Sequence, residues 1–68
     1  MNIAYDPEVD ALSIMFRKAT VTTKELGEGI AVDFDAEGNL VGIEVLDACA
    51  RFGGRETLEE VILEGIGQ

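Results

Sequence analysis

The segment Asp33-Phe-Asp-Ala-Glu-Gly-Asn-Leu-Val-Gly-Ile-Glu44 permits two interpretations, and the choice between them decides the fold. Acidic residues at Asp33, Asp35 and Glu37, a glycine at Gly38 and a closing Glu44 approach the calcium-loop pattern of helix–loop–helix proteins. The apolar residues of the same segment alternate with polar ones, which is typical of half-buried strands. The first interpretation predicts a metal site, and the second predicts a structural hairpin.

The apolar alternation predicts two strands, over about 29–34 and about 40–47. The register that keeps their apolar faces together is Phe34 opposite Val41, Val32 opposite Ile43 and Ile30 opposite Val45. This register requires a four-residue loop, Ala36 to Asn39. A three-residue loop with a glycine bulge is also common at such a sequence. We favour the longer loop, because the shorter one would place Val41 opposite Asp33 and mismatch the two faces.

The metal candidates of this segment are Asp33, Asp35 and Glu44, because calcium prefers oxygen ligands. A calcium loop of this kind needs flanking helices, whereas the flanking residues are strand-like. Glu37 also stands where Asp or Asn is expected, and in a hairpin it lies at the tip of the turn, too far away to share an ion. The hairpin is therefore favoured, with weak divalent-cation binding as the alternative, and no cofactor is expected.

A second hairpin is predicted near the amino terminus. Residues 2–5 and 11–17 each alternate in polarity, and the turn Asp6-Pro-Glu8 lies between them. The matching register places Tyr5 opposite Leu12 and Ile3 opposite Ile14. Residues 18–29 are polar; their threonines favour extended structure, and their glycines mark a bend or bulge.

The carboxy-terminal residues predict one short helix. Thr57-Leu-Glu-Glu60 fits a capping box, the apolar residues that follow are at helical spacing, and Gly65 is a stop signal. A helix this short must pack its apolar side on the sheet. The predicted fold is α+β: a four-stranded antiparallel β-meander with one carboxy-terminal helix packed on one face, in a single domain over 1–68.

The other face of the predicted sheet has apolar members of its own: Met15, Ala31, Leu40 and Leu46. A chain of 68 residues can bury only a small core, and such small domains are often supported by disulfides, a metal or oligomerisation. The single cysteine, Cys49, excludes an internal disulfide, and without histidine the usual zinc sites are excluded as well. We therefore predict a homodimer that uses these four residues or a strand edge.

The composition also limits the partners. The net charge is −9, with 14 acidic and 5 basic residues, so nucleic-acid binding is not expected. A basic protein partner would suit the negative electrostatic field of the chain. No signal peptide and no apolar run approaching the roughly 20 residues of a membrane helix is present, so a cytoplasmic protein with no membrane contact is expected. No catalytic residue is predicted, because the chain has no histidine and Cys49 has no neighbouring base in sequence.

Three blocks of the chain carry a family resemblance: Tyr5-Asp-Pro-Glu-Val-Asp-Ala-Leu-Ser-Ile14, Gly29-Ile-Ala-Val-Asp-Phe-Asp35 and Gly38-Asn-Leu-Val-Gly-Ile-Glu-Val-Leu-Asp-Ala48. They resemble the small prokaryotic proteins of domain-of-unknown-function family 2283. Ser13 departs from the family, where an aromatic residue is frequent. The resemblance implies a β-meander with a carboxy-terminal helix and no established activity, and it implies an antitoxin-like role beside a small toxin-like protein. Taken together, the sequence predicts a non-catalytic protein-interaction module.

Overall fold

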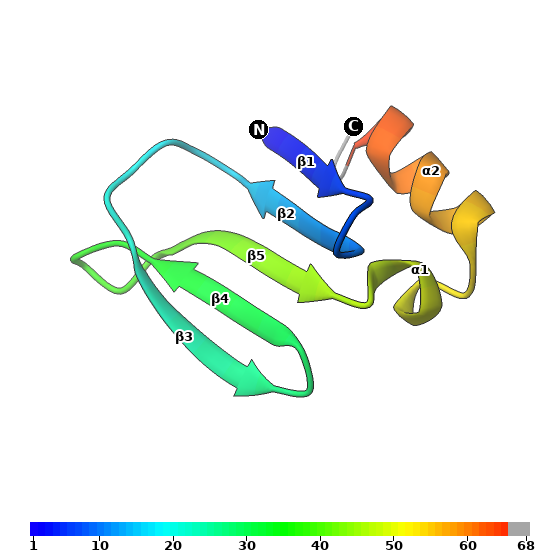
Figure 1. The fold of residues 1–68 in the computed structure, drawn as a ribbon. Helices are drawn as coiled ribbons and strands as arrows, with labels where there is room; N and C mark the ends of the chain where they lie inside the picture. Colours follow the sequence, from blue (N-terminus) through cyan, green and yellow to red (C-terminus); the bar gives the residue numbers. More distant parts are fainter. Residues whose placement is uncertain (66–68) are drawn as a thin grey trace.

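The computed structural model describes residues 1–65 and shows an α+β fold in which five antiparallel strands form one sheet with two short helices (Figure 1). The strands are β1 (Asn2–Asp6), β2 (Ala11–Met15), β3 (Thr22–Gly27), β4 (Ile30–Phe34) and β5 (Leu40–Leu46), and the helices are α1 (Ala48–Arg51) and α2 (Arg55–Glu64). The fold class is as predicted, but the sheet has one more strand and one more helix than expected. The last three residues of the predicted 1–68 domain lie outside the described residues.

The strand order is β1-β2-β5-β4-β3, which is not the order of a meander. After β2 the chain passes along the end of the sheet to the far edge, forms β3 and β4, and returns as β5 between β4 and β2 (Figure 1). The central place suits β5, because Val41, Gly42 and Val45 are all buried. A central strand is protected on both sides, whereas the predicted meander would have left this strand at an edge.

The first hairpin has the predicted register. Tyr5 pairs with Leu12 and Ile3 pairs with Ile14. On the other side of β2, Leu12 pairs with Val45, so one row of apolar side chains crosses three strands. Leu12 is only 1% exposed. Burying a leucine to this degree contributes about 1.5–3 kcal/mol to folding.

The strand that the sequence did not reveal is β3, at the free edge of the sheet next to β4. All of its residues are exposed, so it has no buried apolar alternation that would mark it as a strand. A register shift between Glu25 and Gly27 marks an irregularity in its pairing with β4. The threonines Thr22 and Thr23 were its signal, because β-branched residues suit extended structure.

The β4–β5 hairpin corrects the predicted loop. Ile30 pairs with Val45 and Val32 pairs with Ile43, as expected, but Phe34 pairs with Leu40 instead of Val41. Val41 is therefore an extra residue in β5, which is a β-bulge. Because one inserted residue reverses the alternation of side chains, the bulge returns the apolar residues of the rest of β5 to the core face.

The turn itself has three residues between Asp35 and Asn39. The Asp35 N–H donates to the Asn39 carbonyl at 2.9 Å, and the Gly38 N–H donates to the Asp35 carbonyl at 3.1 Å. Gly38 has a φ of 85°, which glycine adopts without steric cost. This is the shorter loop with a glycine bulge, so the preference for a four-residue loop was wrong. The mismatch of faces that counted against it is removed by the bulge at Val41.

The helix α2 packs on the sheet as predicted. Leu58 is buried against Leu12, Ile14 and Val45, and Gly65 ends the helix with its N–H on the Val61 carbonyl. The predicted capping box is absent, because α2 begins at Arg55 and Gly54 is its N-cap. Thr57 is therefore inside the first turn. The glycine pair before the helix lets the chain enter it three residues earlier than the side-chain pattern indicates.

Candidate functional site

The face of the sheet opposite the helices is here called the outer face. The strand pairing assigns to it Asn2, Ala4, Asp6, Ala11, Ser13, Met15, Thr23, Glu25, Ala31, Asp33, Gly42, Glu44 and Leu46. Leu58 of α2 and Ala48 of α1 belong to the core cluster of the other face, together with Leu12, Ile14 and Val45. Two of the three metal candidates and three of the four interface candidates lie on the outer face. None of the outer-face residues assigned by the strand pairing is basic.

Asp33 is the unusual member of this face, because it is buried although no helix covers it. Its exposed fraction is 2%, and among residues 1–65 it is the one charged residue that is buried. The Thr23 hydroxyl on β3 donates to its Oδ1 at 2.5 Å. Buried polar groups need such a partner, since an unsatisfied carboxylate in the interior is costly. The sequence offered Asp33 as a candidate but gave no sign of Thr23, because the pair depends on the register of β3.

Gly42 provides the space in which Asp33 is buried. It pairs with Met15 on β2 and with Asp33 on β4. A Cβ at this position would lie 2.6 Å from the Ile14 carbonyl oxygen, 2.6 Å from the Met15 sulfur and 3.3 Å from Asp33 Oδ2. The thioether and the carboxylate therefore occupy the volume that a side chain would take. Glycine is required here for close approach rather than for backbone freedom.

Glu44 lies diagonally next to Asp33 on the outer face. Glu44 pairs with Ala31, and Asp33 pairs with Gly42, so the two carboxylates belong to neighbouring strands on the same face. Partial burial, a hydrogen bond with the Asp33 carboxyl and the charge of Asp33 all raise the pKa of Glu44 above its ordinary value. The sequence correctly predicted that these two residues share one face.

Asp35, the third metal candidate, has a different task. Its Oδ1 accepts the backbone N–H groups of Glu37 at 3.0 Å and Asn39 at 2.8 Å, and its Oδ2 accepts the Asn39 amide and the Arg17 guanidinium. The hydrogen bonds from Asn39, Glu37 and Arg17 lower the pKa of Asp35, against a smaller opposing effect of burial. Asp35 therefore organises the turn.

The three metal candidates are thus divided between two places. Asp33 and Glu44 meet on the outer face, while Asp35 is engaged at the turn. Among residues 1–65, no group of three or more acidic or cysteine side chains is arranged to hold a metal ion. Two carboxylates supply few of the six to eight oxygens that calcium takes. The geometry favours a carboxyl pair over a cation site.

The four interface candidates also divide. Met15 and Ala31 are half-buried, and Leu46 is 51% exposed on the outer face. Leu40, 44% exposed, is moved by the bulge: it pairs with Phe34, whose side chain belongs to the helix side of the sheet. It therefore leaves the outer face. The predicted assignment was wrong at this position because it assumed an uninterrupted alternation.

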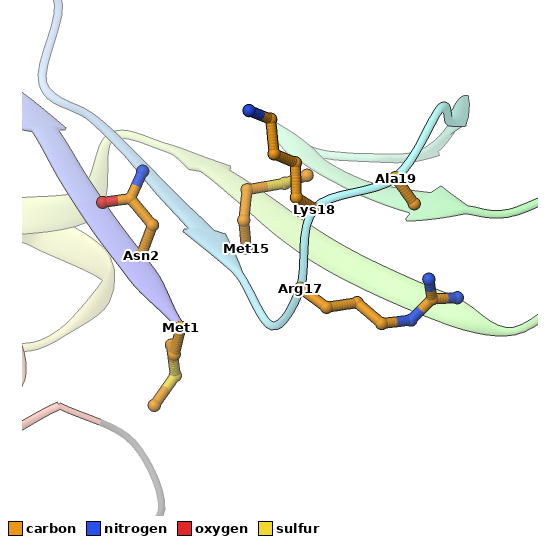
Figure 2. A pocket seen from close by; sticks show the side chains of 6 residues that line it. All are labelled: Met1, Asn2, Met15, Arg17, Lys18 and Ala19. Atoms are coloured by element: carbon orange, nitrogen blue, oxygen red, sulfur yellow. The ribbon is translucent and has the colours of Figure 1, made fainter.

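A hollow of about 470 Å³ lies at the end of the first hairpin, and it contains neither Asp33 nor Glu44. Its lining residues are Met1, Asn2, Met15, Arg17, Lys18 and Ala19. Figure 2 shows that their polar groups do not converge: the Arg17 guanidinium points away from both the Asn2 amide and the Lys18 amine. Arg17 is in addition bound to Asp35. The hollow therefore lacks the converging polar groups of a small-molecule site.

The fold and the site define a small α+β protein whose sheet has one face covered by helices and one open face with a carboxyl pair. The chain belongs to the family described as "Protein of unknown function (DUF2283)", whose model matches residues 2–48. The match spans all five strands and ends at the first residue of α1. No curated protein and no solved structure matches the chain. Neither helix of the described residues is long and apolar enough to cross a membrane.

Proposed function

We propose that the protein is a non-catalytic interaction module that binds a basic protein partner through the outer face. The observation that carries this proposal is the composition of that face: apolar groups at Met15, Ala31 and Leu46 surround the carboxylates of Asp33 and Glu44, and none of the strand residues of that face is basic. The Arg51 guanidinium of α1 reaches the end of β5, where it donates to the Leu46 carbonyl. A protein interface combines apolar contacts with complementary charge. A basic partner supplies the charge that this face lacks.

The charge of the whole chain supports the same partner. A net charge of −9 repels a second copy of the chain and attracts a cationic surface. A homodimer built face to face would also bring four carboxylates together without a counter-charge. The antitoxin-like role implied by the family resemblance is one form of this proposal, with a small basic protein as the partner. Self-association through the free edges β1 or β3 stays a separate prediction.

The test is affinity capture from native lysate with three versions of the chain. Glu44→Lys reverses the charge at the centre of the outer face, and Glu56→Lys makes the same change at an exposed position in the first turn of α2. The wild type and Glu56→Lys are expected to retain one basic protein, identified by mass spectrometry, that Glu44→Lys loses. Equal capture by all three versions, or capture of no basic protein, contradicts the proposal.

A second measurement separates the basic partner from self-association. Sedimentation velocity of the purified protein is expected to show the same association state for the wild type and Glu44→Lys, since the like charges oppose pairing of the outer faces. A dimer that persists in Glu44→Lys would assign self-association to another surface, such as the edge of β3. A dimer that only Glu44→Lys disrupts would replace the basic partner with a second copy of the chain.

A further inference from the structure

The pair of Asp33 and Glu44 places two carboxyl groups next to each other on an open face of the sheet. Asp33 is almost completely buried, and one hydroxyl, that of Thr23, donates to it. A buried carboxylate is costly to ionise, and two neighbouring carboxylates resist carrying two negative charges. The arrangement therefore favours the uptake of a proton by the pair.

The surroundings of the pair offer no charge that would oppose this uptake. The outer-face positions beside it are Ser13 and Met15 on β2, Thr23 and Glu25 on β3, Ala31 on β4 and Gly42 on β5. Glu25 is the titratable group among these neighbours, and its charge is negative. Of the basic residues, Lys24 on β3 belongs to the opposite face, Arg17 is bound to Asp35, and Arg51 of α1 donates to the Leu46 carbonyl at the end of β5.

We propose that Asp33 and Glu44 share one proton and form a proton-linked switch in the sheet. In mild acid the proton lies between the two carboxyl groups, and the outer face presents one negative charge at the pair. As the pH rises the proton leaves, and two adjacent negative charges then repel each other across β4 and β5. The switch changes the charge of the outer face and the stability of the strands beneath it, whether or not that face binds a partner.

Asp33 and Glu44 differ in how directly they exchange the proton with solvent, because their exposure differs. Glu44 is exposed, so it can gain and lose the proton directly, whereas Asp33 is buried and accepts a hydrogen bond from the Thr23 hydroxyl. When Glu44 holds the proton, its carboxyl can donate to Asp33, which then has two donors. The pKa of Glu44 is raised in agreement with this division. The titration belongs to the pair, because each carboxyl affects the other.

The raised pKa of Glu44 decides whether stability rises or falls with pH. Because the folded chain holds this proton more tightly than the unfolded chain, the stabilising contribution is complete below the ordinary Glu pKa of 4.5. It is lost as the pH rises through the folded pKa of the pair. Glu44→Gln replaces the proton donor with a permanent amide donor of the same shape. This variant is expected to keep at neutral pH the stability that the wild type has in mild acid.

The direct test is a titration of the side-chain carboxyl carbons by nuclear magnetic resonance, on the whole chain. In the wild type we expect the Asp33 and Glu44 signals to change together, with the midpoint of the Glu44 signal above 4.5. In Glu44→Gln the joint step should vanish. A Glu44 midpoint at 4.5 or below overturns the proposal. An Asp33 signal with the same pH dependence in Glu44→Gln as in the wild type overturns it as well.

The second test compares melting temperatures between pH 4.5 and pH 7.5. The difference between Glu44→Gln and the wild type should grow as the pH rises, while Glu25→Gln, the matched control on the same face, should follow the wild type. A difference that is constant across this range, or one that Glu25→Gln reproduces, contradicts a proton shared by Asp33 and Glu44. Both readouts use the isolated protein, so their outcome is independent of any partner.

Discussion

The Asp10 carboxylate accepts the backbone N–H of Cys49, with 3.1 Å between the nitrogen and Oδ1. This bond joins the turn between β1 and β2 to the start of α1, across 39 positions of sequence. The Asp10 carbonyl also accepts the Ala48 N–H, and the Tyr5 hydroxyl donates to the Asp10 carboxylate at 2.6 Å. Asp10 therefore caps a helix to which it is remote in sequence, and Tyr5 holds the cap in position.

The Asp10 cap gives the first prediction. Asp10→Ala removes the carboxylate that accepts the Cys49 N–H and the Tyr5 hydroxyl, and it should lower the free energy of unfolding by about 1–2 kcal/mol. Asp47→Ala is a matched control, because Asp47 has the same φ of 54° and makes no side-chain cap. Urea denaturation of both variants isolates the cap from backbone strain. An equal loss in both variants would assign the effect to the left-handed backbone alone.

The close approach at Gly42 gives the second prediction. Gly42→Ala would place a methyl group 2.6 Å from the Ile14 carbonyl, which belongs to the backbone and cannot move away alone. Overpacking of this kind should destabilise the fold by about 1–3 kcal/mol. Ser13→Ala, on the same face but without added volume, is the control. Guanidinium denaturation that finds Gly42→Ala as stable as the wild type would show that β2 and β5 can separate without cost.

The turn carboxylate gives the third prediction. The hydrogen bonds from Asn39, Glu37 and Arg17 lower the pKa of Asp35 below its ordinary 3.8, so its contribution is present above pH 3.8 and is lost as the pH falls through the folded value. Asp35→Asn should therefore have a flatter profile of melting temperature below pH 3.8 than the wild type. Asp6→Asn, at the other hairpin turn, serves as the control. Parallel acid profiles for wild type and Asp35→Asn would contradict this assignment.

Calcium binding stays a prediction from sequence, and the arrangement of the candidate ligands leads us to expect no binding. With Asp35 engaged at the turn, the outer face offers the two carboxylates Asp33 and Glu44. We expect calorimetric titration with calcium to show no saturable heat at millimolar concentration. Saturable heat that Asp33→Asn removes, and that Glu56→Gln leaves unchanged, would restore the metal interpretation.

The alternating segments were predicted well because their information is local. The pairs Ile3–Ile14, Tyr5–Leu12 and Val32–Ile43 follow from placing apolar side chains on one face, and the structure has all three. The edge strand β3 was missed because exposed strands carry no such alternation. The helix α1 was missed because four residues have too little periodicity to be recognised, and its cap comes from Asp10.

The candidate site was predicted in part. That Asp33 and Glu44 lie on one face follows from the parity of two paired strands. That Asp33 is buried does not follow, because it depends on Thr23 on one neighbouring strand and on the space above Gly42 on the other. Leu40 was assigned to the wrong face for a related reason. The bulge at Val41 makes the preferred turn compatible with the preferred strand pairing, and it moves Leu40 away from the outer face.

The sequence by itself determined the α+β class, the two hairpins, the apolar stripe of α2 and the acidic character of the chain. Each of these depends on neighbours within a few residues or on composition. Only the tertiary structure decided that β5 is central, that β3 completes the sheet, and that Asp33 is buried beside Glu44. These features depend on contacts between distant segments, in which the free energy of packing outweighs local preference. The segment from Asp33 to Glu44 is therefore a hairpin whose local turn was open to two choices, and the packed sheet selected one.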